Sequence, residues 1–246
     1  MTKKFKVWFV SLSFGWLLLL TGCQQDMIVR EDVNNLNRGT GTQIIAFGDS
    51  ITAGAGVGTQ AAYPNVLSSL LGLPIVNQGR GGDTTATALS RLQQDVIQEN
   101  PWLVIVGLGG NDFLQEVPLA QTEQNLRQIV TRLQQQGAIV VVLAMNVKPF
   151  NGNYEKLYQR VANDTQAYLI PGVLEGLNDP RYLYDDIHPN QEGHRILANR
   201  IASGLKPLLD KAKKPPNLSG FMQMRTAIYH FAFIRSPCFE RLTVIF

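Results

Sequence analysis

Hydrophobic residues in the middle of the chain form short continuous runs that are separated by more polar segments. Runs of strand length occupy residues 44–47, 74–76, 102–108 and 139–145, and a shorter, weaker run covers 168–170. Runs this continuous, and rich in Val and Ile, are typical of strands that are buried on both faces of a parallel sheet. The pattern therefore predicts a buried five-stranded sheet.

Between these runs, apolar residues recur at helical spacing. The clearest series is Leu126, Ile129, Val130 and Leu133, and Gly137 marks its expected end. Similar series are Leu89, Leu92 and Val96; Tyr154, Leu157, Tyr158 and Val161; and Leu197, Ile201 and Leu205, the last in a helix expected to begin near Asn190. Alternating strands and helices predict βαβ units with right-handed crossovers. We expect a three-layer α/β/α domain over residues 43–212, with a parallel sheet in the middle.

The first 22 residues have the pattern of an export signal, with three lysines before an apolar run over residues 7–20. Those 14 residues are fewer than the roughly 20 that a membrane-spanning helix needs. The run ends in Leu20-Thr21-Gly22-Cys23, which resembles the lipobox of bacterial lipoproteins. That resemblance implies a lipoprotein signal peptide over 1–22 and a lipid on Cys23. The alternative is an ordinary cleaved signal followed by a chance cysteine.

Residues 23–42 are mostly polar and predict a flexible tether between the membrane and the domain. Because Gln24 rather than Asp follows the cysteine, the lipoprotein resemblance implies the outer membrane, with the domain facing the periplasm. The other cysteine is Cys238, so a lipidated Cys23 would leave no intramolecular disulfide. We therefore expect a bacterial envelope protein held by an N-terminal lipid anchor.

The net charge of +3 comes from the two ends of the chain. The signal carries +3 and residues 213–246 carry +4, which leaves −4 for residues 23–212. A mildly acidic domain gives no reason to expect nucleic-acid binding. Residues 213–246 form an atypical tail that begins Lys213-Lys214-Pro215-Pro216 and is rich in Phe and Arg without a clear period. It is either a partner-binding or membrane-surface segment or, as we favour, a divergent tail without catalytic importance.

Four polar clusters follow the predicted strands: 48–52, 77–84, 109–112 and 184–190. The carboxyl ends of parallel strands lie along one edge of the sheet, so the four clusters should converge there. Acyl transfer needs a nucleophile, a base, a group that orients the base, and donors for the oxyanion. The matching candidates are Ser50 as nucleophile, His188 as base, Asp185 as its orienting carboxylate, and the backbone N–H groups of Ser50 and Gly82 with the side-chain amide of Asn111 as donors.

These clusters, Gly-Asp-Ser, the glycine of the second cluster, Gly-Gly-Asn-Asp and Asp-x-x-His, resemble the four sequence blocks of the SGNH (GDSL) hydrolase superfamily over about residues 43–210. Gly-Gly-Asn-Asp and Asp-x-Ile-His-Pro-Asn are most similar to its bacterial arylesterase and acyl-CoA thioesterase/lysophospholipase group. The resemblance implies a flavodoxin-like fold and hydrolysis of ester or thioester bonds in small-molecule or lipid substrates. It implies the same roles for Ser50, Asp185 and His188 as catalytic triad, and for Gly82 and Asn111 as oxyanion donors.

Two alternatives to this function stay open: a carbohydrate O-deacetylase, and a non-catalytic envelope lipoprotein that binds lipid or glycan. Other polar residues have structural interpretations. We expect Asp49 to brace the nucleophile loop and Asp112 to stabilise a turn, and Asp186 is an alternative orienting acid. His194 is expected on a helix surface. Three histidines without a cysteine pair in the domain predict no metal site, and the glycine-rich segment 54–58, which lacks dinucleotide-loop spacing, predicts no cofactor.

Overall fold

The computed structural model describes residues 32–37, 39–145, 152–215 and 217–218. The predictions for the signal over 1–22, for Cys23 and for residues 219–246 lie outside the described residues. In the part of the chain that is described, no helix is both long enough and apolar enough to cross a membrane.

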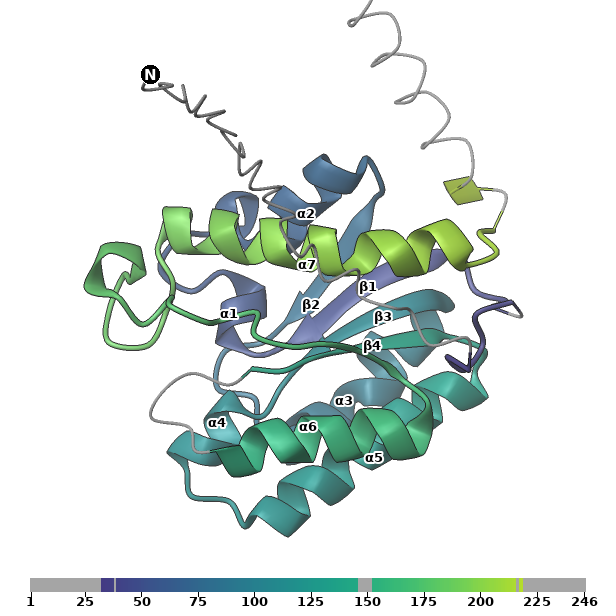
Figure 1. Cartoon of the computed structure of the whole chain (residues 1–246), viewed down its shortest axis with the longest axis horizontal. Helices are drawn as coiled ribbons and strands as arrows, with labels where there is room; N and C mark the ends of the chain where they lie inside the picture. The colour runs from purple at the N-terminus through teal and green to yellow at the C-terminus, as the bar shows by residue number, and fades with distance from the viewer. Residues whose placement is uncertain (1–31, 38, 146–151, 216, 219–246) are drawn as a thin grey trace, which may run out of the picture.

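Five parallel strands form one sheet in the order β2-β1-β3-β4-β5 (Figure 1). Their bounds are β1 Gln43–Gly48, β2 Ile75–Gly79, β3 Pro101–Gly107, β4 Ile139–Leu143 and β5 Tyr168–Ile170. This is the flavodoxin-like doubly wound order, in which the strand sequence reverses direction between β1 and β3 and ligands bind beyond the carboxyl ends at that point. The predicted three-layer α/β/α fold is confirmed.

Helices cover both faces of the sheet (Figure 1). α2 (Tyr63–Leu71) and α7 (Gln191–Lys211) pack together on one face, and α3 (Thr85–Asp95), α5 (Leu119–Gln135) and α6 (Gly152–Thr165) lie on the other. Two short helices, α1 (Ser50–Ala53) and α4 (Gly110–Leu114), follow β1 and β3 directly. Short 3-10 turns occupy Thr59–Ala61, Ile97–Glu99 and Pro180–Tyr182.

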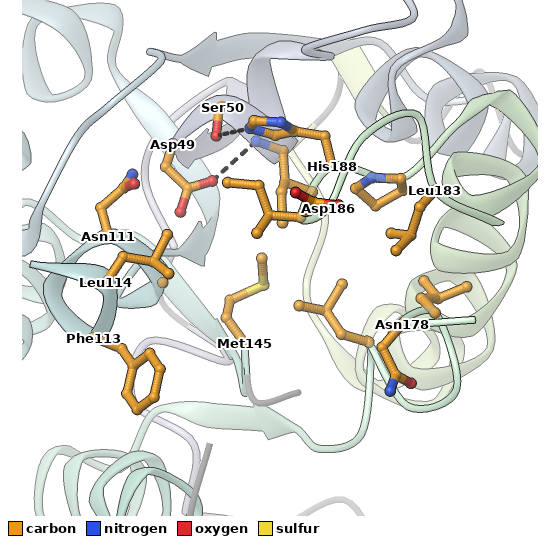
Figure 2. Close-up of a pocket in the computed structure, with 16 residues that line it drawn as sticks. Asp49, Ser50, Asn111, Phe113, Leu114, Met145, Asn178, Leu183, Asp186 and His188 are labelled. Atoms are coloured by element: carbon orange, nitrogen blue, oxygen red, sulfur yellow. Dashed lines mark hydrogen bonds between the residues drawn. The ribbon is translucent and has the colours of Figure 1, made fainter. Parts of the chain in front are cut away.

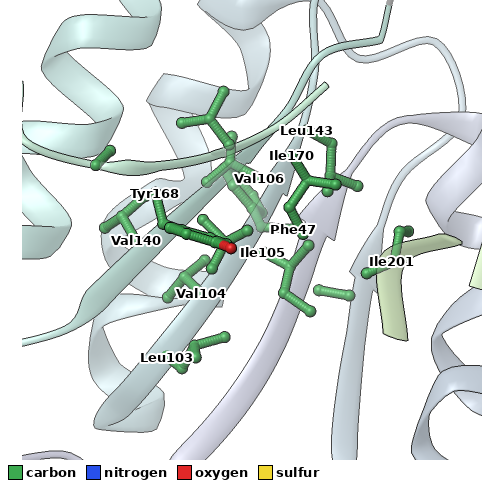
Figure 3. Packing of buried hydrophobic residues seen from close by; sticks show 14 of the residues in the cluster. Phe47, Leu103, Val104, Ile105, Val106, Val140, Leu143, Tyr168, Ile170 and Ile201 are labelled. Carbon is green, nitrogen blue, oxygen red and sulfur yellow. The ribbon is translucent and has the colours of Figure 1, made fainter. Parts of the chain in front are cut away.

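The core lies between the central strands and the two helix layers (Figure 3). All residues of β3 and β4 are buried, as continuous apolar runs predict for a sheet covered on both faces. The helical series on α5 faces inward, and Leu126, Ile129, Val130 and Leu133 are fully buried. Full burial of one such side chain contributes about 1.5–3 kcal/mol. The sheet edge that carries the site is therefore held by a rigid interior.

Some predicted bounds were wrong. β2 begins at Ile75 and runs to Gly79, so residues 77–79, expected in a loop, belong to the strand. Its pairing with β1 continues as far as Gly48 opposite Gly79, beyond the apolar run, because backbone hydrogen bonds need no apolar side chain. Residues 108 and 144–145, expected in strands, lie past the ends of β3 and β4.

The segment predicted as a flexible tether also differs. Within residues 32–42, Val33 and Leu36 are buried in the core, and the Asn35 side chain donates to the carbonyl oxygens of Gln134 at 2.8 Å and Ala138 at 2.9 Å. These contacts lie at the amino ends of the strands. The two apolar side chains pack against the hydrophobic core at this end of the domain, and their removal from water stabilises the packing. This part of the segment therefore belongs to the fold.

The start of the predicted tail packs beside the same segment. The backbone N–H of Lys213 donates to the carbonyl of Leu36, Asn217 donates to the carbonyl of Thr42, and Leu218 is buried. The folded unit therefore extends beyond residues 43–212 at both ends.

Candidate active site

Ser50 lies at the turn between β1 and α1, at the carboxyl edge of the sheet. Gly48 permits this tight turn because a Cβ at its position would lie 2.1 Å from Thr52 Oγ1 and 2.5 Å from the Gly107 carbonyl oxygen. The Asp49 side chain caps α1 by accepting from the N–H of Ile51 at 3.0 Å. As the first residue of α1, Ser50 has a backbone N–H without an intrahelical acceptor, which leaves that N–H available to a ligand.

His188 and Asp185 share the loop that leads into α7. The loop is closed by hydrogen bonds from Tyr184 N to the His188 carbonyl and from Asn190 N to the Tyr182 carbonyl, both 2.8 Å. Asn190 also caps α7, accepting from Gly193 N at 3.0 Å, as predicted for the start of this helix. The base candidate is therefore held by the first turn of a long helix.

Ser50, His188 and Asp185 form a continuous hydrogen-bonded chain, of which Figure 2 shows Ser50 and His188. Ser50 Oγ lies 2.9 Å from His188 Nε2, and His188 Nδ1 lies 2.8 Å from Asp185 Oδ2. The other oxygen of Asp185 accepts from the backbone N–H groups of Ile187 and His188. These hydrogen bonds, of which the one from His188 has the largest effect, lower the pKa of Asp185 to about 2. Its carboxylate is therefore ionised at neutral pH.

Asn111 lies on α4 beside Ser50, and one N–H of its side-chain amide donates to the Asp83 carbonyl at 2.9 Å. The amide carries a second N–H that can serve a ligand. Gly82 has a positive φ of 78° and open space where a Cβ would be, but it is not among the residues that line the described pocket. Asp185 does not line the pocket either, and it is connected to the pocket by its hydrogen bond to His188. The structure thus brings Ser50, Asn111, His188 and Asp185 together, and the donor role of Gly82 stays a prediction.

A pocket of about 220 Å³ opens beside Ser50 and His188 (Figure 2). Most of its wall is apolar, and the apolar members are Ile51, Phe113, Leu114, Met145, Leu174, Leu177, Leu183, Ile187 and Pro189. Two of them, Leu114 and Ile187, are 52% and 49% exposed, so part of the apolar wall is accessible to solvent. The arrangement can hold a hydrocarbon group against a nucleophilic serine.

Residues 46–196 match the model of the GDSL-like Lipase/Acylhydrolase family. Esterase TesA of Pseudomonas aeruginosa is 30% identical over 204 residues, covering 78% of this chain and 98% of that protein. Thioesterase 1/protease 1/lysophospholipase L1 of Escherichia coli K12 is 31% identical over 176 residues, covering 68% and 85%. A crystal structure of TesA superposes with a TM-score of 0.64 at 31% identity, covering 68% of this chain and 99% of that one.

This chain belongs to the GDSL family. It is therefore a carboxylic ester hydrolase of the serine esterase type, as the sequence blocks predicted. The matched range includes the turn of the candidate nucleophile Ser50 near one end and the loop of the candidate base His188 near the other.

Asp49 is a buried neighbour of Ser50, the candidate nucleophile. Its side chain is 3% exposed, and burial raises the pKa of Asp49 to about 7, although the hydrogen bond from Ile51 N and the nearby His188 oppose this rise. The predicted bracing role agrees with its cap on α1. The motif gave no sign that a carboxyl group so close to Ser50 would titrate near neutrality.

Two further residues are more deeply embedded than we predicted. Asp112 is fully buried and accepts from the N–H and hydroxyl of Thr85, which ties α4 to α3. His194, expected on a helix surface, is also fully buried, and its Nδ1 accepts from Tyr63 N at 3.2 Å. Its side of α7 packs on α2, because the inward face of α7 is wider than the Leu197, Ile201 and Leu205 series indicated.

Sequence reasoning also missed the apolar pocket wall, since its members come from five separate segments. Among the described residues, no group of three or more His, Cys, Asp or Glu side chains is placed to hold a metal ion.

Proposed function

We propose that this esterase hydrolyses carboxylic esters and thioesters of hydrocarbon acyl groups through an acyl-enzyme on Ser50. The observation that carries the proposal is the Ser50–His188–Asp185 chain of hydrogen bonds at the edge of an apolar pocket. Each contact has the length that serine activation requires, with Nε2 facing the Ser50 hydroxyl and Nδ1 facing the Asp185 carboxylate.

In the proposed mechanism, Ser50 Oγ attacks the acyl carbonyl while His188 Nε2 takes the hydroxyl proton. The ionised Asp185 holds Nδ1–H and stabilises the imidazolium that forms. The N–H groups of Ser50 and Gly82 and the free amide N–H of Asn111 would stabilise the oxyanion. His188 then gives its proton to the leaving alcohol or thiol, and a water molecule, activated by the same imidazole, releases the acid.

The pocket supports an acyl group over a sugar as the part of the substrate that is bound. Its wall carries few hydrogen-bonding groups beyond the catalytic edge, whereas a sugar would leave its hydroxyls unpaired there. Each buried CH₂ contributes about 0.8 kcal/mol, so kcat/KM should rise about fourfold per added methylene until the pocket is filled. The names of the TesA and lysophospholipase relatives support the same substrate class.

Fluorophosphonate labelling tests the nucleophile. The parent should be labelled, and Ser50→Ala should not be. Ser69→Ala is a matched control, because Ser69 is an exposed serine of α2 whose hydroxyl bonds to its own helix. An unlabelled parent, or a labelled Ser50→Ala variant, would contradict the mechanism.

A substrate series tests the acyl preference. p-Nitrophenyl acetate, butyrate and octanoate, a lysophospholipid, a fatty acyl thioester and acetylated xylan should be compared by kcat/KM. The proposal expects a rise from acetate to longer acyl groups. Strict preference for acetylated xylan would favour the O-deacetylase, and no hydrolysis with retained ligand binding would favour a non-catalytic lipoprotein.

We also propose that the esterase is held at the bacterial envelope by a lipid on Cys23, most simply on the periplasmic side of the outer membrane. The support is the order of basic start, apolar run and Leu-Thr-Gly-Cys in the sequence. Two or more acyl chains on one residue suffice for stable anchoring. The mature protein should begin at Cys23 with added acyl mass, and Cys23→Ser should move it to the soluble fraction; an unmodified Cys23 would refute the anchor.

A further inference from the structure

Arg91 is a buried arginine on α3 that lies outside all four sequence blocks. Its Nε donates to Asp83 Oδ2 at 2.6 Å, and its Nη1 donates to Asp95 Oδ2 at 3.1 Å. Its Nη2 donates to the backbone carbonyls of Gly48 at 3.1 Å and Gln78 at 3.0 Å. One guanidinium thus joins the ends of β1 and β2 to the loop that follows β2.

The same side chain is held on one face by an aromatic ring. The guanidinium carbon of Arg91 lies 4.5 Å from the centre of the Phe47 ring, and Arg91 is only 7% exposed. A planar group with several fixed donors, packed in this way, has little freedom to move. A lysine could supply the charge at this position but not the fork of hydrogen bonds.

Asp83 connects this arginine to the candidate oxyanion donor. Its carboxylate accepts from Arg91 and, at 3.0 Å, from Thr87 Oγ1, while its backbone carbonyl accepts from Asn111 Nδ2 at 2.9 Å. The carboxylate therefore fixes the Asp83 peptide, and that peptide fixes the rotation of the Asn111 amide. The remaining N–H of that amide is the one proposed to meet the oxyanion.

We propose that Arg91 and Asp83 are positioning residues that aim the Asn111 amide at the oxyanion. This inference rests on the oxyanion role of Asn111 in the proposed function. The effect travels through geometry, because the two carboxylates that flank the guanidinium compensate its charge. Donors act best when they are already aligned with the charge that develops, so a small rotation of the amide should slow the chemical step.

Arg91→Lys tests the inference by steady-state hydrolysis of p-nitrophenyl butyrate. Loss of one oxyanion donor costs about 10²–10³-fold in kcat, so a misdirected donor should cost about 10–100-fold. KM should change by less than about threefold, because Arg91 does not line the pocket that holds the acyl group. Arg127→Lys is the matched control, since Arg127 forms ion pairs on the outer side of α5, and its kcat should equal that of the parent.

Combination with Asn111→Ala separates positioning from a general structural role. If Arg91 acts through the amide, Arg91→Lys should cost no more than about threefold once the amide is gone, because residues that act as a unit are not additive. An equal cost in both backgrounds, or no fall in kcat in the parent, would overturn the inference while leaving Asn111 as a donor. A wild-type kcat in Asn111→Ala itself would overturn the oxyanion role instead.

If Arg91→Lys does not fold, Thr87→Val can replace it in the same double-mutant comparison with Asn111→Ala, because it is a smaller perturbation. It removes the hydrogen bond to the Asp83 carboxylate and the bond that Thr84 N donates to Thr87 Oγ1 at the start of α3, and it leaves the buried ion pair intact. We expect a fall in kcat of about three- to tenfold in the parent, and almost none after Asn111→Ala. Equal costs in both backgrounds would again refute the positioning role.

Discussion

Replacement of Asp49 by Asn should change how the stability of the esterase depends on pH. Asp49 is almost fully buried beside the nucleophile, and burial raises its pKa from 3.8 to about 7. Asn has nearly the same shape and keeps an oxygen that can accept from Ile51 N. The substitution therefore removes the titration of the group and keeps the cap on α1.

The size of the effect follows from the two pKa values of Asp49. Between pH 3.8 and about 7 the unfolded chain has lost this proton and the folded protein still holds it, so the free energy of unfolding falls as pH rises. From pH 5 to pH 8 the loss amounts to about two pKa units, or about 3 kcal/mol, at about 1.36 kcal/mol per unit. The amide of the Asp49→Asn variant has no proton to lose, so this part of the pH dependence should vanish.

Urea unfolding followed by far-UV circular dichroism at pH 5, 6, 7 and 8 provides the measurement. The difference in unfolding free energy between Asp49→Asn and the parent should shift by about 3 kcal/mol in favour of the variant across this range. Asp210→Asn is the control, because Asp210 is exposed and paired only with Lys206, and it should follow the parent. Parallel curves for Asp49→Asn and the parent would refute a buried, protonated Asp49.

Three other substitutions test the site and its supports. Asp185→Asn should lower kcat about 10⁴-fold with an unchanged fold, because the imidazole of the base would lose its orienting carboxylate; stopped-time ester assays measure this, and a loss below about tenfold would contradict the triad. Gly48→Ala should destabilise by about 1–3 kcal/mol or more, since its Cβ would clash with Thr52 and the Gly107 carbonyl; an unchanged melting temperature would show that the turn relaxes. Burial, and to a lesser extent the nearby His188 charge, lowers the pKa of His194 to about 4. The free energy of unfolding of the parent should therefore fall by about 3 kcal/mol between pH 6.5 and pH 4, and that of His194→Gln should fall markedly less in urea titrations over this range. An identical fall in the two proteins would contradict a neutral buried imidazole.

The strands and the main helices could be predicted because their patterns have one physical solution. A run such as 139–143 cannot be exposed on either face, and the Leu126 to Leu133 series has one inward side. The parallel order then brings the four polar clusters to one edge. Ser50, Asn111, Asp185 and His188 were predictable from topology and chemistry together, before any distance was known.

Long-range burial was not predictable from the sequence. Val33 and Leu36 are isolated apolar residues in a polar segment, and their burial is visible only in the folded structure, where Asn35 between them bonds to residues about one hundred positions away. Arg91 is likewise a charged residue within a helix, where the sequence alone would predict exposure to solvent. Its burial depends on carbonyls and carboxylates from three other segments, and no local pattern records their convergence.

The packing of residues 33–37 and 39–42 sets the end of the domain at which the N-terminal segment joins the fold. The chain enters the fold where the strands begin, and the triad lies where they end, about 20 Å away along a seven-residue strand. If Cys23 carries a lipid, as proposed, the first described residues after it pack at the end of the domain opposite the pocket. An enzyme anchored in this way would meet dissolved esters, or esters on a facing surface, more readily than the lipids of its own membrane.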